Sequence, residues 1–237
     1  DDVSIEEVEA LKRFYGLDRS MFEQYILWFA KFIRGDMGYS FEYQKPVSYL
    51  LGERLPYTIL LTVFPLIFTY AAAVPIGIYA ATHQYSPGDY FFSILGFAGL
   101  ATPNFMLALI LMFMFFKYFG VSVGGLFSAE YALAPWSLAK IWDLVRHLWA
   151  PIIVIGTAGT AGIIRVMRGT LLDELGKQYV ITARAKGAPE GKLLFKYPVR
   201  IAANPIASTI GWQLPNIVSG ETIVAIVLGL PTVGPML

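Results

Sequence analysis

The sequence has no cysteine, only two histidines and few charged residues, and each scarcity excludes a class of site. Without cysteine the chain forms no disulfide and offers no thiolate ligand to a metal. His83 and His147 stand in different segments, so we expect neither a zinc site nor a histidine-based catalytic centre. Charged residues make up 15% of the chain and hydrophobic residues 56%, against about 25% and about 45–50% in soluble domains. This composition is typical of a membrane protein.

Nucleic-acid binding and nucleotide binding are not expected either. The net charge of +1 lacks the clearly basic balance of a nucleic-acid-binding domain. The stretch GAPEGKL (187–193) looks like a phosphate loop, but a Walker A loop has four residues between its glycines and a Ser or Thr after its Lys. Here three residues separate Gly187 from Gly191, and Leu193 follows Lys192. We therefore expect no catalytic residue, no metal and no cofactor in this chain.

Four long apolar segments predict membrane-spanning helices near residues 55–82, 89–117, 147–168 and 196–222. At about 1.5 Å per residue, the uncharged run 55–81 would extend roughly 40 Å, against a hydrocarbon core about 30 Å thick. Bundled membrane helices tolerate the prolines in or beside these segments as kinks. The alternative, a set of buried helices in a large soluble protein, fits these lengths poorly. We predict an all-α, polytopic helical membrane protein with its transmembrane domain at 53–237.

Residues 1–52 differ in composition and are predicted to form an extracytoplasmic amphipathic lead-in. Within 20–38, aromatic and aliphatic residues recur at helical spacing with Glu23, Lys31 and Arg34 among them. The stretch is too polar to span, so it should lie at the membrane surface or pack against the bundle.

The orientation follows from basic residues near the ends of the spans. Residues 165–200 hold eight basic and three acidic residues, a net charge of +5, which places this segment in the cytoplasm. Four spans then put residues 1–54, 117–147 and the C-terminal end outside. The turn at 83–89 falls inside but contains neither Lys nor Arg.

Polar residues within the apolar segments are candidates for a translocation path. Glu221 lies in an apolar stretch, and a carboxylate near membrane depth is costly unless it faces water or a partner. The alternatives for Glu221 are an ion pair with another span or subunit, or a place at the outer interface. Pro103 predicts a bend that turns Asn104 inward, or else a kink that only improves packing. The predicted path residues are Asn104, Gln213, Asn216, Ser219 and Glu221.

The stretch GTAGTAG (156–162) makes one helix surface small. Small residues let helix backbones approach closely in lipid, so we interpret this surface as a packing face. A cavity wall for substrate is the alternative.

The basic segment 173–191 predicts a helix, a tight turn and a second helix. Acidic residues early in 173–186 and basic residues late match the helix dipole. Gly187 can end this helix in a left-handed conformation, Ala188 resists helical geometry because it precedes Pro189, and Pro189 suits the first turn of a new helix. The small residues keep the turn slim enough to enter a groove on another protein. A solvated connector between spans is the alternative.

The segment YVITARAKGAPEGKLLFKYPVRIAANPI (179–206) resembles the cytoplasmic EAA loop of ABC importer permease subunits, and most closely the peptide-type group that handles oligopeptides, dipeptides and nickel. That group typically has DYVRTARAKG, a basic stretch and LRNAL.P, and residues 182–187, Arg200, Asn204 and Pro205 match it. Thr182 replaces the Glu of the older EAA consensus, as is usual in this group. Further segments are similar to the family in the same order: RGDMGYSF, ERLPYTILLT, GLATPNF, RVMRGTLLDEL and ETIVAIVLGLPTVGPML.

The resemblance implies a type I ABC importer transmembrane domain in the cell (inner) membrane, with four of about six spans, because the family has one span before and one after this region. It implies a second permease subunit, two ATP-binding subunits that carry ATP and Mg, and an extracytoplasmic substrate-binding protein. It also assigns an ATPase-coupling role to Tyr179, Thr182, Ala183, Arg184, Ala185, Lys186, Gly187 and Ala188.

Peptides are the substrate that the resemblance favours, and related permeases carry oligosaccharides or nickel chelates. Two other classes remain open. One is a membrane assembly or scaffold protein that moves no solute. The other is a secondary transporter, which the near absence of intramembrane charge disfavours.

Overall fold

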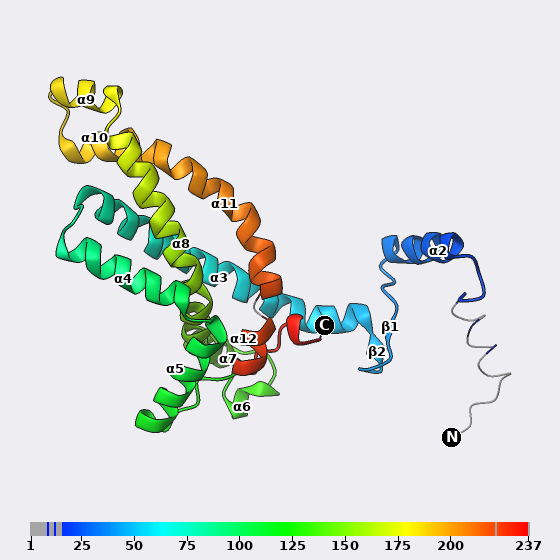
Figure 1. Ribbon diagram of the computed structural model, residues 1–237. Helices are drawn as coiled ribbons and strands as arrows, with labels where there is room; N and C mark the ends of the chain where they lie inside the picture. The colour runs from blue at the N-terminus through cyan, green and yellow to red at the C-terminus, as the bar shows by residue number, and fades with distance from the viewer. Residues whose placement is uncertain (1–8, 10–11, 13–15, 221, 237) are drawn as a thin grey trace. The chain divides into compact units, whose positions relative to one another are not determined.

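The computed structural model describes residues 9, 12, 16–220 and 222–236, with the backbone alone for 213–220. The chain divides into two compact units, Asp1–Leu55 and Pro56–Leu237. Apart from turns and loops, the described residues form helices and a single pair of two-residue strands, so the all-α prediction is confirmed (Figure 1).

The first unit contains the predicted amphipathic helix, α2 (Met21–Ile33). A capping box begins it, because the Glu23 backbone N–H donates to Ser20 Oγ while the Ser20 backbone N–H donates to Glu23 Oε2. No residue of α2 is buried. Two short strands, β1 (Tyr39–Ser40) and β2 (Lys45–Pro46), then pair antiparallel.

The second unit is a helical assembly around α8. Helix α3 (Val47–Thr82) enters it from the first unit with Pro56, Pro65 and Pro75 inside the helix. The remaining elements are α4 (Pro87–Ala101), α5 (Asn104–Phe119), α6 (Ala129–Ala132), α7 (Leu138–His147), α8 (Trp149–Leu175), α9 (Gln178–Ala185), α10 (Glu190–Lys196), α11 (Pro198–Gly220), α12 (Thr222–Leu228) and the 3-10 turn η1 (Gly234–Met236).

Two helical segments, Val47–Thr82 and Leu138–Leu175, are long and apolar enough to cross a membrane, and the pair α4 and α5 makes a third if it forms one span. Helix α11 covers most of the fourth predicted segment, but its side chains are described only as far as Trp212, and it does not meet the same test. The number of four spans therefore stays a prediction.

The predicted bend at Pro103 is confirmed, and it is larger than a kink. Helices α4 and α5 meet at 102°, so the segment 89–117 is two helices instead of one. Thr102 is extended, with φ −92° and ψ 119°, because the ring of the following proline excludes the helical region. The helix therefore ends at this point, and α5 begins directly after Pro103.

Helix α8 packs against α4, α5, α7 and α11. Its small surface is a packing face at Gly156, because a Cβ there would lie 2.5 Å from Phe68 Cδ1 and 3.3 Å from the Pro65 carbonyl oxygen on α3. Thr69 Oγ1 donates to the Gly156 carbonyl at 2.9 Å, which fixes the same contact. The interpretation of GTAGTAG as a close-packing surface is confirmed at this position.

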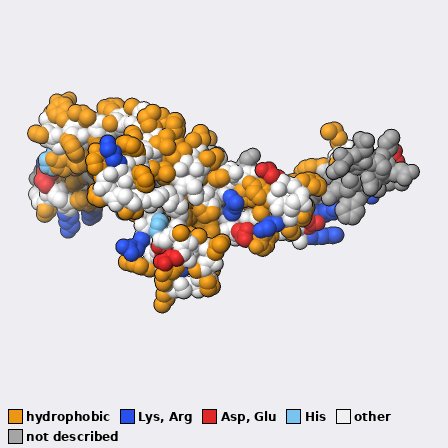
Figure 2. Space-filling model, turned by 90° about the horizontal axis from the view of Figure 1, so that it is seen from below, with side chains coloured by type: hydrophobic (Ala, Val, Ile, Leu, Met, Phe, Trp, Pro, Cys, Tyr) orange, Lys and Arg blue, Asp and Glu red, His pale blue; other side chains and the backbone are white. Residues whose placement is uncertain are grey.

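Hydrophobic side chains also cover much of the visible surface (Figure 2). On α4 and α5 the exposed residues include Phe91, Ile94, Phe113 and Phe116, each at least 60% exposed. Such a surface is unfavourable in water and matches the surroundings of a membrane helix.

Candidate functional site

The candidate site is the hairpin formed by α9 and α10, which lies at one end of α8 and α11 (Figure 1). The prediction of a single helix over 173–186 was wrong at its start. Helix α8 continues through Asp173 and Glu174 to Leu175, and α9 begins only at Gln178. Gly176 lies at the break, where the low helix propensity of glycine favours an end. The two acidic residues therefore belong to the end of α8.

The turn between the two helices has the predicted left-handed glycine. Gly187 has φ +77°, and its N–H donates to the Arg184 carbonyl at 2.9 Å. The Ala188 N–H donates to the Ala183 carbonyl at 3.3 Å, which satisfies a carbonyl left free at the helix end. Pro189 precedes α10 as its N-cap, one position earlier than predicted. The turn is thus closed by backbone hydrogen bonds on both sides of Gly187.

A bidentate ion pair crosses the turn. Arg184 Nε donates to Glu190 Oε1 at 2.6 Å, and Nη2 donates to Oε2 at 3.1 Å. Through these hydrogen bonds Arg184 lowers the pKa of Glu190, and Glu190 raises the pKa of Arg184. The resemblance gives Arg184 a coupling role, and in the structure its charge is paired with Glu190 inside the hairpin. Opposite charges six residues apart across a Gly-Ala-Pro turn were the sequence signal for this pair.

The hairpin contacts the rest of the second unit through α10, where Leu194 packs against the buried cluster formed by α3, α8 and α11. Val180 on α9 is 0% exposed, and Leu193 on α10 is 1% exposed. Tyr179 Oη donates to Glu174 Oε2 at 2.6 Å, and burial together with this carboxylate raises the pKa of Tyr179 to about 12. Tyr179 therefore connects α9 to the end of α8 and is only partly exposed.

The remaining candidates divide by exposure. Ala183 and Ala188 are half-buried, whereas the exposed residues are Thr182, Arg184, Ala185, Lys186 and Gly187. Thr182 Oγ1 donates to the Gln178 carbonyl on its own helix. Sequence reasoning missed two large apolar side chains beside them, Ile181 at 47% and Phe195 at 61% exposed. Their signal was a bulky apolar residue within a small and basic segment.

The candidate path residues are only partly described. Asn104 is the first residue of α5 and is half-buried. Gln213, Asn216 and Ser219 belong to the part of α11 with a described backbone alone, and Glu221 lies outside the described residues. In the described ranges 16–220 and 222–236, with residues 9 and 12, no group of three or more His, Asp or Glu residues is placed to hold a metal ion.

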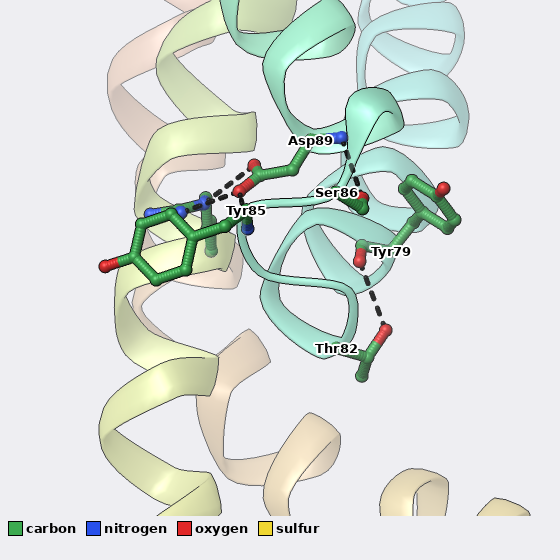
Figure 3. A network of polar contacts seen from close by, with 6 residues as sticks. Tyr79, Thr82, Tyr85, Ser86 and Asp89 are labelled. Atoms are coloured by element: carbon green, nitrogen blue, oxygen red, sulfur yellow. Dashed lines mark hydrogen bonds and ion pairs between the residues drawn. The ribbon is translucent and has the colours of Figure 1, made fainter.

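Sequence reasoning also missed a charged contact on α8. Asp89, in the first turn of α4, forms an ion pair with Arg168 on α8; Figure 3 shows Asp89 beside Tyr85 and Ser86 of the preceding turn. The signal was a single carboxylate at the start of an otherwise uncharged segment.

Comparison with known proteins identifies the family. The family model for "binding-protein-dependent transport system inner membrane component" matches residues 73–237. The oligopeptide transport system permease protein AppB of Bacillus subtilis is 34% identical over 94% of this chain and 69% of its own length. A putative peptide permease protein of Brucella ovis is 33% identical (98% and 71%), and the dipeptide transport system permease protein DppB of Alkalihalophilus pseudofirmus is 28% identical (99% and 74%).

These matches cover most of the chain, and the candidate spans agree with them. They make the protein a helical permease component in the inner membrane rather than an enzyme. Membership of this kind of transporter implies an ATPase partner and a substrate-binding partner. The chain belongs to the family of binding-protein-dependent transport system inner membrane components.

Proposed function

We propose that this chain forms one half of the translocation path of an ATP-driven peptide importer and that the α9–α10 hairpin couples it to an ATPase subunit. The permeases named above for oligopeptides, dipeptides and peptides support the substrate class. The observation that carries the coupling role is the hairpin itself, whose turn is exposed while Val180 and Leu193 are buried and Leu194 packs against the cluster of α3, α8 and α11.

The hairpin is connected to two long helices, α8 and α11, through which its displacement can be transmitted. Leu194 packs α10 against the buried cluster of α3, α8 and α11, and Tyr179 hydrogen-bonds α9 to the end of α8. On the other side only Tyr197 separates α10 from the first residue of α11. A displacement of the hairpin is therefore delivered to α8 and to α11, and α8 alone extends about 40 Å at about 1.5 Å per residue.

The exposed surface of the hairpin suits a groove on a partner. Thr182, Ala185 and Gly187 are small, so the turn can enter a narrow cleft. Ile181 and Phe195 supply apolar area, and Lys186 supplies an exposed positive charge. Apolar anchors surrounded by polar contacts are typical of stable protein interfaces.

The complete transporter in this proposal has a second permease subunit, two ATP-binding subunits and an extracytoplasmic substrate-binding protein. ATP and Mg bind to the ATP-binding subunits, and no cofactor binds to this chain. Asn104, Gln213, Asn216, Ser219 and Glu221 are proposed to contribute polar groups to the path. The first of these follows the break between α4 and α5, where backbone polar groups are freed from the helix.

The test is to purify the chain gently with its companions and to reconstitute uptake in vesicles. We expect two ATPase subunits to accompany it, and ATP-dependent uptake of labelled di- and oligopeptides when the binding protein is added. Labelled oligosaccharide and chelated nickel are the comparison substrates. An actively transporting preparation that contains no ATPase would refute the proposal, and uptake of the comparison substrates alone would refute the peptide assignment.

A further inference from the structure

We infer that Asp89 and Arg168 form a second coupling joint, which makes α4 move together with α8 when the hairpin is displaced. The inference rests on the proposed coupling role of the hairpin. It adds a route by which motion reaches the broken pair α4–α5, which the hairpin itself does not adjoin in the chain.

The contact between the two residues is bidentate and mostly buried. Arg168 Nε donates to Asp89 Oδ1 at 3.0 Å, and Nη2 donates to Oδ2 at 2.9 Å (Figure 3). The Asp89 side chain is 4% exposed and the Arg168 side chain 29%. A guanidinium that binds both carboxylate oxygens fixes orientation as well as distance. The pair therefore resists sliding and rotation of α4 on α8.

The turn before α4 holds the carboxylate in place. The Tyr85 N–H donates to Asp89 Oδ2 at 3.0 Å, from a residue with φ +62°, and the Asp89 N–H donates to Ser86 Oγ at 3.2 Å (Figure 3). A left-handed residue other than glycine is uncommon and marks a constrained turn. Gly88 lies against Tyr79, since a Cβ there would overlap the tyrosine hydroxyl oxygen. The turn thus fixes the position of the Asp89 carboxylate independently of the ion pair with Arg168.

Three helices contact α8 at the same level. Gly77 of α3 faces Met167, where a Cβ would lie 2.6 Å from the methionine Cβ. Thr170 Oγ1 lies 3.2 Å from the Ala202 carbonyl of α11, although its shorter hydrogen bond, at 2.8 Å, is to the Val166 carbonyl of its own helix. The contact to α3 at Gly77 is a van der Waals contact, and the contact to α11 at Ala202 is a long polar contact. The contact to α4 is a bidentate ion pair, which resists sliding of the two helices more than the other two contacts do.

The position of the pair connects the hairpin to the break at Pro103. Arg168 lies seven residues before Leu175, about 10 Å along α8 from the end that carries the hairpin. Helix α4 then leads to the 102° bend and to Asn104. Motion of α8 would reach this candidate path residue through Asp89 and α4.

A purely structural role makes a different prediction. Buried ion pairs are often no more stabilising than apolar residues of the same size, although removal of one partner is costly. If the pair only stabilised the fold, its loss would lower the amount of assembled transporter and leave each assembled transporter fully coupled. A coupling joint instead lowers the number of substrates imported per ATP hydrolysed.

The experiment uses the complete importer in vesicles and compares Asp89→Asn and Arg168→Lys with Arg165→Gln. Arg165 is the matched control, because its exposed guanidinium also reaches α4, 5.2 Å from the Phe97 ring centroid, through a ring contact rather than a bidentate ion pair. We expect Asp89→Asn to lose about tenfold in peptide uptake per ATP hydrolysed, a size typical of coupling between sites. Arg168→Lys should lose less, because it keeps the charge without the fork, and Arg165→Gln should match the wild type.

Normal uptake per ATP in assembled Asp89→Asn would overturn the inference. If Gly187→Val uncouples transport in the same assay, the proposed function survives that result; if Gly187→Val is also normal, the proposed function fails as well. Should the variants not assemble, spin labels on Tyr90→Cys and Val166→Cys give a second measurement, since both positions are exposed and the chain has no other cysteine. The distance between the labels should stay constant between the nucleotide-free and ATP-bound importer, and a change would overturn the inference.

Discussion

Gly187 is the position at which the coupling proposal can be tested most sharply. It has φ +77°, and no heavy atom lies within 4 Å of where a Cβ would be placed. A substitution therefore costs backbone conformational energy and meets no neighbour within the chain. The left-handed conformation costs an ordinary residue roughly 1–2 kcal/mol, and a β-branched residue more, whereas asparagine adopts it comparatively well.

The three variants Gly187→Asn, Gly187→Ala and Gly187→Val separate conformation from size. A cost of roughly 1–2 kcal/mol lowers the population of the native turn by a factor of about 5–30. We expect uptake per ATP hydrolysed to fall in the order Asn, Ala, Val, with Asn nearest to the wild type although its side chain is larger than that of Ala. Val should also reduce recovery of the ATPase subunits on purification.

The assay measures peptide uptake, substrate-stimulated ATP hydrolysis and the amount of this chain in the membrane for each variant. The amount of this chain in the membrane should be equal for all variants, because the turn lies outside the helices that are long and apolar enough to cross a membrane. Full uptake with stable ATPase association in Gly187→Val would falsify the coupling role. A larger defect in Asn than in Ala would show that bulk at the partner surface decides the outcome, and would refute the conformational argument.

Three further predictions concern charge and packing. Arg184→Glu should lose substrate-stimulated ATP hydrolysis, and the double variant with Glu190→Arg should recover it if the pair acts within the turn; no recovery would mean that Arg184 contacts the partner directly. The pKa of Glu190 is lowered from 4.5 in the folded hairpin, so the contribution of the Arg184–Glu190 pair to hairpin stability is fully present above that value and is lost as pH falls through the lowered pKa. A spin label on the hairpin should become mobile only in this lower pH range. Glu190→Gln should abolish this pH dependence. Gly156→Ala should destabilise the protein by about 1–3 kcal/mol, since its Cβ would overlap Phe68. Gly162→Ala is the control: no atom lies within 4 Å of its Cβ position, so the thermal unfolding midpoint in detergent should not change. Equal midpoints for the two variants would contradict the packing argument.

Local features of this protein follow from the sequence alone. The apolar runs predict helices at α3 and α8, because a helix is the way for an isolated apolar segment to satisfy its backbone hydrogen bonds in lipid. Thr102 is extended because proline follows it, and Gly187 is left-handed because glycine has no Cβ to oppose that conformation. These outcomes depend on a residue and its immediate neighbours, so they are readable without the fold.

The contacts between side chains were decided by the tertiary structure. Arg168 meets Asp89 across 79 residues of sequence, because α4 packs on α8 with their facing sides in one register. Tyr179 hydrogen-bonds to Glu174, since α8 continues past the expected helix start to Leu175, and the sequence did not predict this contact. Which charge finds which partner depends on how whole helices pack, and no local pattern carries that information.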